Sequence, residues 1–135
     1  MIKNFLITIF LIGFTFAQSK VLIQDKEVSV ENNEALIEVL GMVCSMCAFG
    51  IQEGFSDKEF VDKSRFSNGV VVDLDAPYVR VGLKKESEAN PEAIMTVIQD
   101  AGYDVSSLFI IQQNQLLEFK VDDIGILQPV FKSYN

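Results

Sequence analysis

The residues best suited to chemistry are two cysteines, Cys44 and Cys47, in the stretch Gly41-Met42-Val43-Cys44-Ser45-Met46-Cys47. They are the only two cysteines of the chain, which has no histidine. Thiolates are soft ligands that favour Cu(I), mercury and similar ions over calcium or magnesium. Any soft-metal or thiol redox chemistry therefore depends on this pair.

The spacing of the pair favours an open metal site. Two intervening residues let both sulfurs turn inward on one loop, which suits two-coordinate binding. Cys47 is expected in the first turn of a helix, where free backbone N–H groups and the helix dipole favour a thiolate. A closed structural zinc site normally takes four ligands, which two cysteines without histidines do not provide.

Two other uses of the pair were weighed. A disulfide across two intervening residues would constrain the unfolded chain very little, although lone pairs in exported proteins often oxidise. A thiol–disulfide oxidoreductase is the alternative function, but thioredoxin-like sites resemble W-C-G-P-C. This chain has no tryptophan, and Ser45 and Met46 stand between its cysteines. We therefore expect a binding protein rather than an enzyme.

The first residues resemble a leader. Lys3 precedes an apolar run from Phe5 to Phe16, which closes on Ala17 before polar residues. A bilayer-spanning helix needs about 20 apolar residues, so the run is short for a span. The pattern predicts a signal peptide over residues 1–17 and export to the periplasm or the medium, with an uncleaved anchor as the alternative.

The charge of the chain excludes one class of partner. It carries 11 basic and 19 acidic residues, for a net charge of −8. Nucleic-acid binding relies on a basic surface, so we expect no nucleic-acid partner. The acids Glu53, Asp57 and Glu59 are interpreted as solvated surface or as a face for a basic partner.

Hydrophobic periodicity predicts the elements that position the cysteines. Strands are expected over 35–40, 70–74, 78–83 and 105–111, and helices over 45–55 and 91–101. This order is that of an α+β, ferredoxin-like βαββαβ sandwich, with two helices on one face of an antiparallel sheet. The expected domain covers 34–111, between an arm or extra strand at 18–33 and an extension at 112–135. Residues 116–121 are a candidate edge strand, and the shape of 56–68 is left open.

Two motifs together resemble a family. Gly41-Met42-Val43-Cys44-Ser45-Met46-Cys47 resembles the G-M-x-C-x-x-C loop of heavy-metal-associated domains, and Asp100-Ala101-Gly102-Tyr103-Asp104 is similar to the stretch after their second helix. That family includes copper chaperones, N-terminal domains of metal-pumping P-type ATPases and periplasmic mercury-binding proteins. The resemblance covers about residues 34–108. It departs from the family in a longer segment between Cys47 and the second strand.

The resemblance implies roles for individual residues. Cys44 and Cys47 would be the metal ligands and Cu(I) the cargo, with Hg(II), Zn(II) and Cd(II) as alternatives. Val43 replaces the acid that zinc- or cadmium-handling members often have, which favours a monovalent ion. Met42 is expected in the core beneath the loop and Met46 at the solvent. Tyr103 would shield the site or simply pack.

The resemblance also implies partners. A metal-accepting protein, such as a P-type ATPase or an efflux component, would receive the ion by thiolate exchange. Two chains sharing one Cu(I) through four cysteines would form a metal-bridged homodimer, so both a monomer and this dimer remain open.

Overall fold

The computed structural model describes residues 19–41 and 45–130, except for the side chains of Ser45 and Cys47. The predicted leader, Met42, Val43 and Cys44 lie outside this description. The elements in chain order are β1 (Ser19–Ile23), β2 (Lys26–Val30), β3 (Glu34–Leu40), α1 (Ser45–Ser56), β4 (Val70–Asp73), β5 (Tyr78–Gly82), α2 (Pro91–Asp100), β6 (Asp104–Gln112), β7 (Gln115–Val121) and β8 (Leu127–Pro129).

The main sheet is antiparallel, and its strands lie in the order β4-β5-β3-β6-β7-β8. The predicted α+β class with two helices is confirmed. The four strands expected for the domain correspond to β3, β4, β5 and β6, and β7 and β8 extend the sheet beyond β6. β1 pairs with β2 in a separate hairpin. The candidate edge strand at 116–121 is β7, and it lies inside the sheet because β8 pairs with its outer side.

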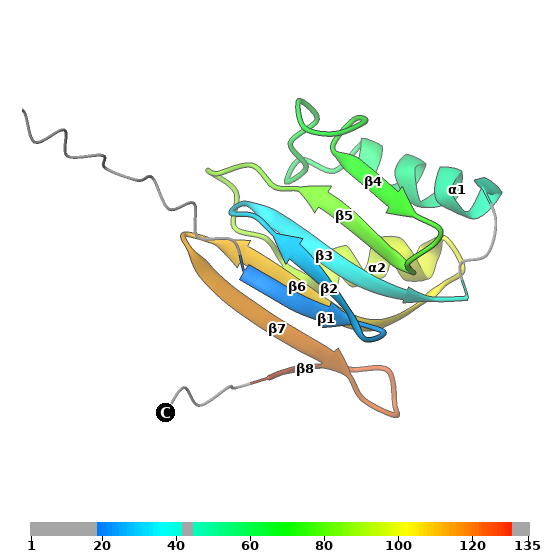
Figure 1. Ribbon diagram of the computed structural model, residues 1–135. Coiled ribbons are helices and arrows are strands. Elements are labelled where there is room, and N and C mark those ends of the chain that lie inside the picture. The colour runs from blue at the N-terminus through cyan, green and yellow to red at the C-terminus, as the bar shows by residue number, and fades with distance from the viewer. Residues whose placement is uncertain (1–18, 42–44, 131–135) are drawn as a thin grey trace, which may run out of the picture.

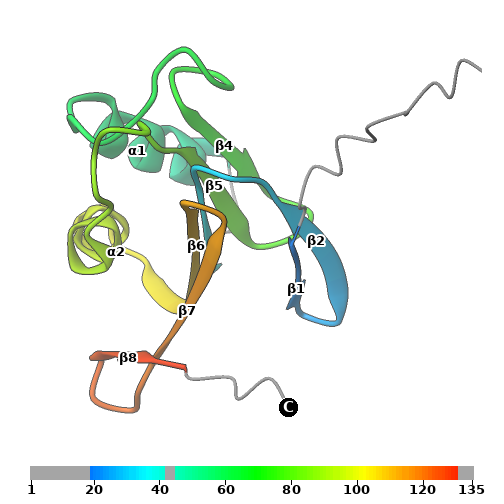
Figure 2. The ribbon, with the colours of Figure 1, turned by 90° about the vertical axis from the view of Figure 1, so that its left-hand side faces the viewer.

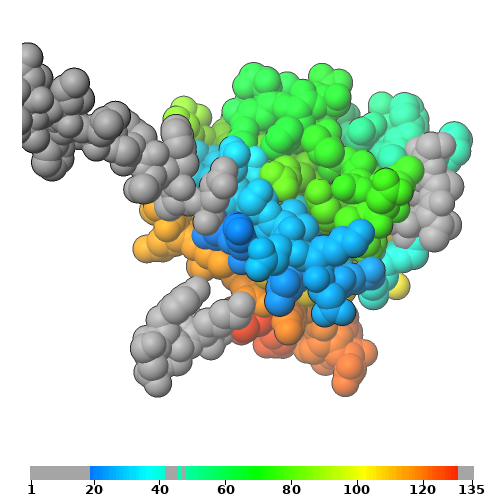
Figure 3. All heavy atoms as spheres, in the orientation of Figure 1, coloured from blue at the N-terminus to red at the C-terminus, as the bar shows by residue number. Residues whose placement is uncertain are grey.

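The two faces of the sheet are covered differently. Figure 2 shows α1 and α2 on one side of the sheet and the β1–β2 hairpin on the other. Seen from the hairpin side, the hairpin lies across the sheet in the foreground (Figure 3), whereas the helices lie behind the strands (Figure 1). Each side has its own buried cluster: Ile37, Ile51, Phe55, Ile94, Ile98 and Leu108 are members on the helix side, and Val21, Ile23, Val28, Val30, Leu36 and Phe109 on the hairpin side.

Local signals explain the second helix. The side-chain oxygen of Asn90 accepts hydrogen bonds from the backbone N–H groups of Glu92 (3.0 Å) and Ala93 (3.2 Å). Pro91 fits the first helical position because that residue needs no N–H donor, and its fixed φ suits a helix. Gly102 follows the helix with a φ of +94°, a conformation that costs glycine little. The predicted start and end of this helix are therefore confirmed.

The segment between α1 and β4, whose shape the sequence left open, is a series of turns held by long-range contacts. Val61 bridges to Leu83, and the N–H of Asp62 donates to the carbonyl oxygen of Gly82 (2.9 Å). The guanidinium of Arg65 donates to the carboxylate of Glu34 (2.5 Å), which is 1% exposed. The segment is thus fastened to the start of β3 at the far end of the sheet from Gly41.

Arg80 completes this buried charge cluster. It lies on β5, where one guanidinium nitrogen is 3.4 Å from the second oxygen of Glu34 and another donates to the carbonyl oxygen of Ser29 on β2 (2.8 Å). The cluster therefore connects the hairpin, the central strand, β5 and the irregular segment. Within the described ranges, no helix has the length and apolar character needed to cross a bilayer.

Candidate metal-binding site

The central strand leads directly into the cysteine motif. The side chains of β3 from Glu34 to Ile37 are buried, whereas Leu40 at its end is 46% exposed. Gly41 then takes a φ of +83°, which ends the strand. Other residues adopt this conformation at a cost of roughly 1–2 kcal/mol, so the glycine is suited to the turn.

The pairing of β3 with β6 brings the two sequence motifs together. Leu40 pairs with Asp104 as the last register position, after an irregularity between Glu38 and Val39. Gly41 and Tyr103, which flank this pair, therefore lie at the same end of the sheet. The resemblance implied that Tyr103 lies beside the cysteine loop, and among the described residues this pairing brings Gly41 and Tyr103 to the same end of the sheet.

The first helix begins within the motif. α1 starts at Ser45, so Cys47 is in the first turn as predicted, and Ile51 and Phe55 on the same helix are fully buried. Cys44 lies outside the described residues, as does the side chain of Cys47. The assignment of both cysteines as ligands therefore stays a prediction, based on the position of Cys44 between β3 and α1 in the chain and of Cys47 in the first turn of α1.

The turn between β4 and β5 lies at the same end of the sheet as Gly41. The carboxylate of Asp73 accepts the N–H groups of Asp75 (2.9 Å) and Ala76 (3.0 Å), and the N–H of Val39 donates to the carbonyl oxygen of Pro77 (2.9 Å). These bonds fix the turn and attach it to the end of β3.

Two titratable groups of this turn are perturbed. The backbone N–H of Ala76, assisted by that of Asp75, lowers the pKa of the Asp73 carboxyl by stabilising its charged form. Burial raises the pKa of the Tyr78 phenol, and the nearby charge of Asp73 acts in the same direction. Neither group belongs to the cysteine motif, so we assign both a structural role.

The end of α2 also lies at this end of the sheet. The N–H of Gly102 donates to the carbonyl oxygen of Gln99 (2.9 Å), and that of Tyr103 to the carbonyl oxygen of Ile98 (3.2 Å). Tyr103 is half-buried and packs against the helix-side cluster. Packing is therefore one role of this side chain, and shielding of a bound ion stays a prediction.

Exposed apolar side chains surround the motif. Met46 is 78% exposed, in agreement with its predicted solvent position, and Phe49, one helical turn later, is 60% exposed. Leu40 ends β3, and Leu74 (44% exposed) is the first residue of the turn between β4 and β5. Sequence reasoning missed Leu40, Phe49 and Leu74, because apolar residues inside an expected strand or helix are normally assigned to the core. For Leu40 and Phe49, the available signal was their closeness to the cysteine motif in the sequence, whereas Leu74 lies far from it along the chain and gave no such signal.

Polar groups give no competing metal site in the part of the chain that the structure describes. Among these residues, no cluster of three or more histidine, cysteine, aspartate or glutamate side chains has a suitable arrangement. Glu53, Asp57 and Glu59 are exposed, as expected for solvated surface.

Comparisons with known proteins give only structural likenesses. No known protein family and no curated protein matches the sequence. The CopZ metallochaperone is 24% identical, covers 53% of this chain and 97% of its own, and has a TM-score of 0.45. The yeast copper transporter domain Ccc2a, also 24% identical, covers 53% of this chain and 89% of its own, with a TM-score of 0.44.

A third solved structure, a protein from Bacillus anthracis strain Ames, is 23% identical. It covers 68% of this chain and its own full length, with a TM-score of 0.43. Likenesses of this size do not establish a family for the chain. The functional argument therefore uses the chain's own residues and their arrangement.

Proposed function

We propose that this chain is an exported protein that binds a soft metal ion, Cu(I) above all, through Cys44 and Cys47. In this proposal the ion is cargo, held for sequestration or for transfer to a partner. Hg(II), Zn(II) and Cd(II) are the alternative ions. Export would follow removal of residues 1–17, and residues 34–111 would form a heavy-metal-associated domain of ferredoxin-like βαββαβ type.

One observation carries the proposal: the pairing of Leu40 with Asp104 at the end of β3 and β6. It brings Gly41, at the start of the C-x-x-C stretch, next to Tyr103 of the second motif. The sequence resemblance requires these two motifs to meet at one site. Their arrangement in this fold supports it, since neither motif alone would predict where the other lies.

The chemistry follows from the number of thiols. Two thiolates satisfy a soft monovalent ion and leave its other positions open to the thiols of a partner. The start of α1 supplies free N–H groups and a positive helix end, which favour a thiolate at Cys47. The exposed Met46 and Phe49 offer apolar surface beside the motif, where a metal-accepting protein such as a P-type ATPase or an efflux component would dock.

The proposal is tested by competition between the protein and a Cu(I) chelator. Reduced protein from Gln18 onward should take up one Cu(I) per chain as a monomer, or one per two chains as a metal-bridged dimer, and the variant carrying both Cys44→Ser and Cys47→Ser should take up none. Met46→Leu is the matched control, because it removes the exposed thioether and leaves both thiols. Uptake that survives loss of both thiols would refute metal binding by Cys44 and Cys47, and equal preference for zinc would refute Cu(I) as the favoured ion. Sedimentation of the loaded protein separates a monomer from a metal-bridged dimer.

The alternative, a thiol–disulfide oxidoreductase, uses the same pair of cysteines. It predicts catalytic reduction of a protein disulfide and loss of that activity when either cysteine is replaced. Our proposal predicts no turnover beyond that of a free dithiol at the same concentration. Measuring both Cu(I) uptake and disulfide reduction on one preparation distinguishes the two functions.

A further inference from the structure

The extension of the sheet beyond β6 creates a groove that the metal-binding proposal does not use. Leu117, Phe119 and Val121 lie on the helix side of β7, because they alternate along the strand and Phe119 pairs with Leu108 of the helix-side cluster. α2 packs on β6 and leaves β7 partly open, so Leu117 remains 48% exposed.

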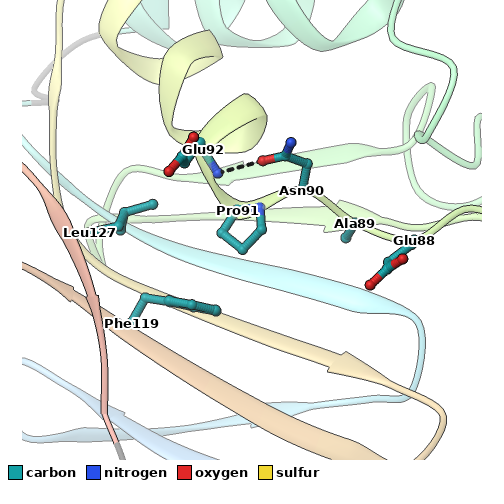
Figure 4. Close-up of a pocket in the computed structure, with 7 residues that line it drawn as sticks. All are labelled: Glu88, Ala89, Asn90, Pro91, Glu92, Phe119 and Leu127. Carbon is teal, nitrogen blue, oxygen red and sulfur yellow. Dashed lines mark hydrogen bonds between the residues drawn. The ribbon is translucent and has the colours of Figure 1, made fainter.

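The groove runs between this apolar strip and the start of α2. A hollow of about 550 Å³ is lined by Phe119 and Leu127 on one side and by Ala89 and Pro91 on the other. Figure 4 shows Pro91, Phe119 and Leu127 grouped around the same space. A second hollow of about 340 Å³ shares Ala89 with the first and continues it to Leu117.

The charges at the groove identify the occupant. Among the described residues, Glu88 and Glu92 are the charged side chains that line the larger hollow, and Lys85, Glu86 and Glu88 are those that line the smaller one. An acidic border disfavours an anionic membrane and a second copy of this acidic chain, because like charges would be brought together. It complements a partner in which lysine or arginine flanks apolar side chains.

The turn between β7 and β8, beside the groove, is stabilised by side-chain hydrogen bonds and exposes apolar side chains. The carboxylate of Asp122 accepts the N–H groups of Ile124 (3.1 Å) and Ile126 (2.8 Å) and the side-chain amide of Gln128 (3.1 Å). Ile124 is nevertheless 78% exposed and Ile126 is 51% exposed. Ordered apolar side chains beside an apolar groove are typical of an interaction surface.

From these observations we propose that the groove between β7–β8 and the start of α2 docks a basic, apolar segment of a partner protein. The segment would lie on the face of the sheet, because Pro129 on the outer strand β8 has no N–H to offer to an added strand. The groove begins at Pro91, whereas Tyr103 beyond the other end of α2 borders the cysteine motif. The two surfaces are separated by the ten residues of α2, on the order of 15 Å, so one partner can occupy both.

Three short synthetic peptides test the proposal with the purified chain. One alternates lysine with leucine, a second replaces leucine with serine, and a third replaces lysine with glutamate. Only the first should bind, with NMR shift changes centred on Ala89, Phe119 and Leu127. Binding should weaken as salt is raised, because exposed charges are screened.

Matched charge variants decide whether the groove is responsible. The pair Glu88→Gln and Glu92→Gln should weaken binding of the lysine–leucine peptide by about fivefold, the size expected for two exposed ion pairs. Glu53→Gln with Glu59→Gln, which removes the same charge elsewhere, should leave binding within about twofold.

The proposal is wrong if all three peptides bind alike, if both variant pairs lose affinity equally, or if the shifts centre on Gly41 and Met46. It is also wrong if the chain instead self-associates through β7 or binds anionic vesicles there. The peptide assay contains no metal ion, so a negative result in it leaves the Cu(I) proposal unchanged.

Discussion

Gly54 of α1 lies against Val97 of α2 so closely that a Cβ atom at Gly54 would be 2.8 Å from Cγ1 of Val97. Real Cβ contacts of that length essentially never occur, and Val97 is only 4% exposed. The two helices therefore depend on the missing side chain for their approach. At Gly50, one turn earlier on the same helix, a Cβ atom would have no atom of the described residues within 4 Å.

This contrast predicts opposite effects of the same substitution. Gly54→Ala should lower the free energy of unfolding by about 1–3 kcal/mol, the usual cost of overpacking a core. Gly50→Ala should raise it by about 0.5–1 kcal/mol, because alanine favours a helix and nothing obstructs it. Urea unfolding of both variants measures the difference. Equal effects of the same sign would show that the helices do not approach at Gly54.

Gly41 and Gly125 form a matched pair for the cysteine motif. Both have a φ of +83°, and at either position a Cβ would meet no atom of the described residues within 4 Å. Alanine at either site should therefore cost about 1–2 kcal/mol of stability through backbone strain alone. Only Gly41→Ala should also weaken Cu(I) uptake, because Gly41 begins the motif. Equal Cu(I) affinity in the two variants, measured by chelator competition, would argue against a fixed loop geometry.

The buried charge cluster predicts that replacing Glu34 destabilises the fold strongly, whereas replacing Glu31 has a small effect. Glu34→Gln should destabilise the fold by about 3–5 kcal/mol, because it leaves the charges of Arg65 and Arg80 without their buried partner. Glu31 is 55% exposed and 3.9 Å from Arg65, so Glu31→Gln should cost about 0–1 kcal/mol. Thermal unfolding of both variants, each removing one negative charge, makes the comparison. A mild effect at Glu34 would mean that the cluster is accessible to water.

The pKa of Asp73 gives a pH dependence with a definite sign. This pKa is lowered in the folded protein, mainly by the N–H of Ala76, so the charged carboxylate stabilises the fold above the ordinary value of about 3.9. That stabilisation is lost as the pH falls from about 4 through the folded pKa. The difference in free energy of unfolding between the native chain and the Asp73→Asn variant should therefore decrease in this acid range. NMR titration of the carboxyl carbon would contradict the prediction if its midpoint lay above the ordinary value.

Local signals made most of the elements predictable. The start of α2 was read correctly because Asn90 and Pro91 act within one helical turn, and the buried alternation of Val79 and Val81 marks β5 whatever surrounds it. The first helix was recognised by the spacing of Ile51 and Phe55. Each of these signals depends on residues only a few positions apart.

The parts that escaped prediction depend on distant partners. The shape of the segment after α1 depends on the contact between Arg65 and Glu34, 31 residues away. β8 has three residues and is defined by its pairing with β7. The β1–β2 hairpin lacked the usual signal, because its two-residue turn with positive φ is formed by Gln24 and Asp25, where Asn-Gly or Asp-Gly is the common sequence.

The central position of β3 has a consequence for the order of events during folding. Its partners β5 and β6 are made tens of residues later, so the strand has no sheet to join until most of the chain exists. Pairings between distant segments slow folding, because loop closure costs entropy before any contact compensates for it. Tyr103 and Asp104, which lie beside the start of the cysteine motif, come after β5 and α2 in the chain, so this border of the motif forms only after those elements have been made.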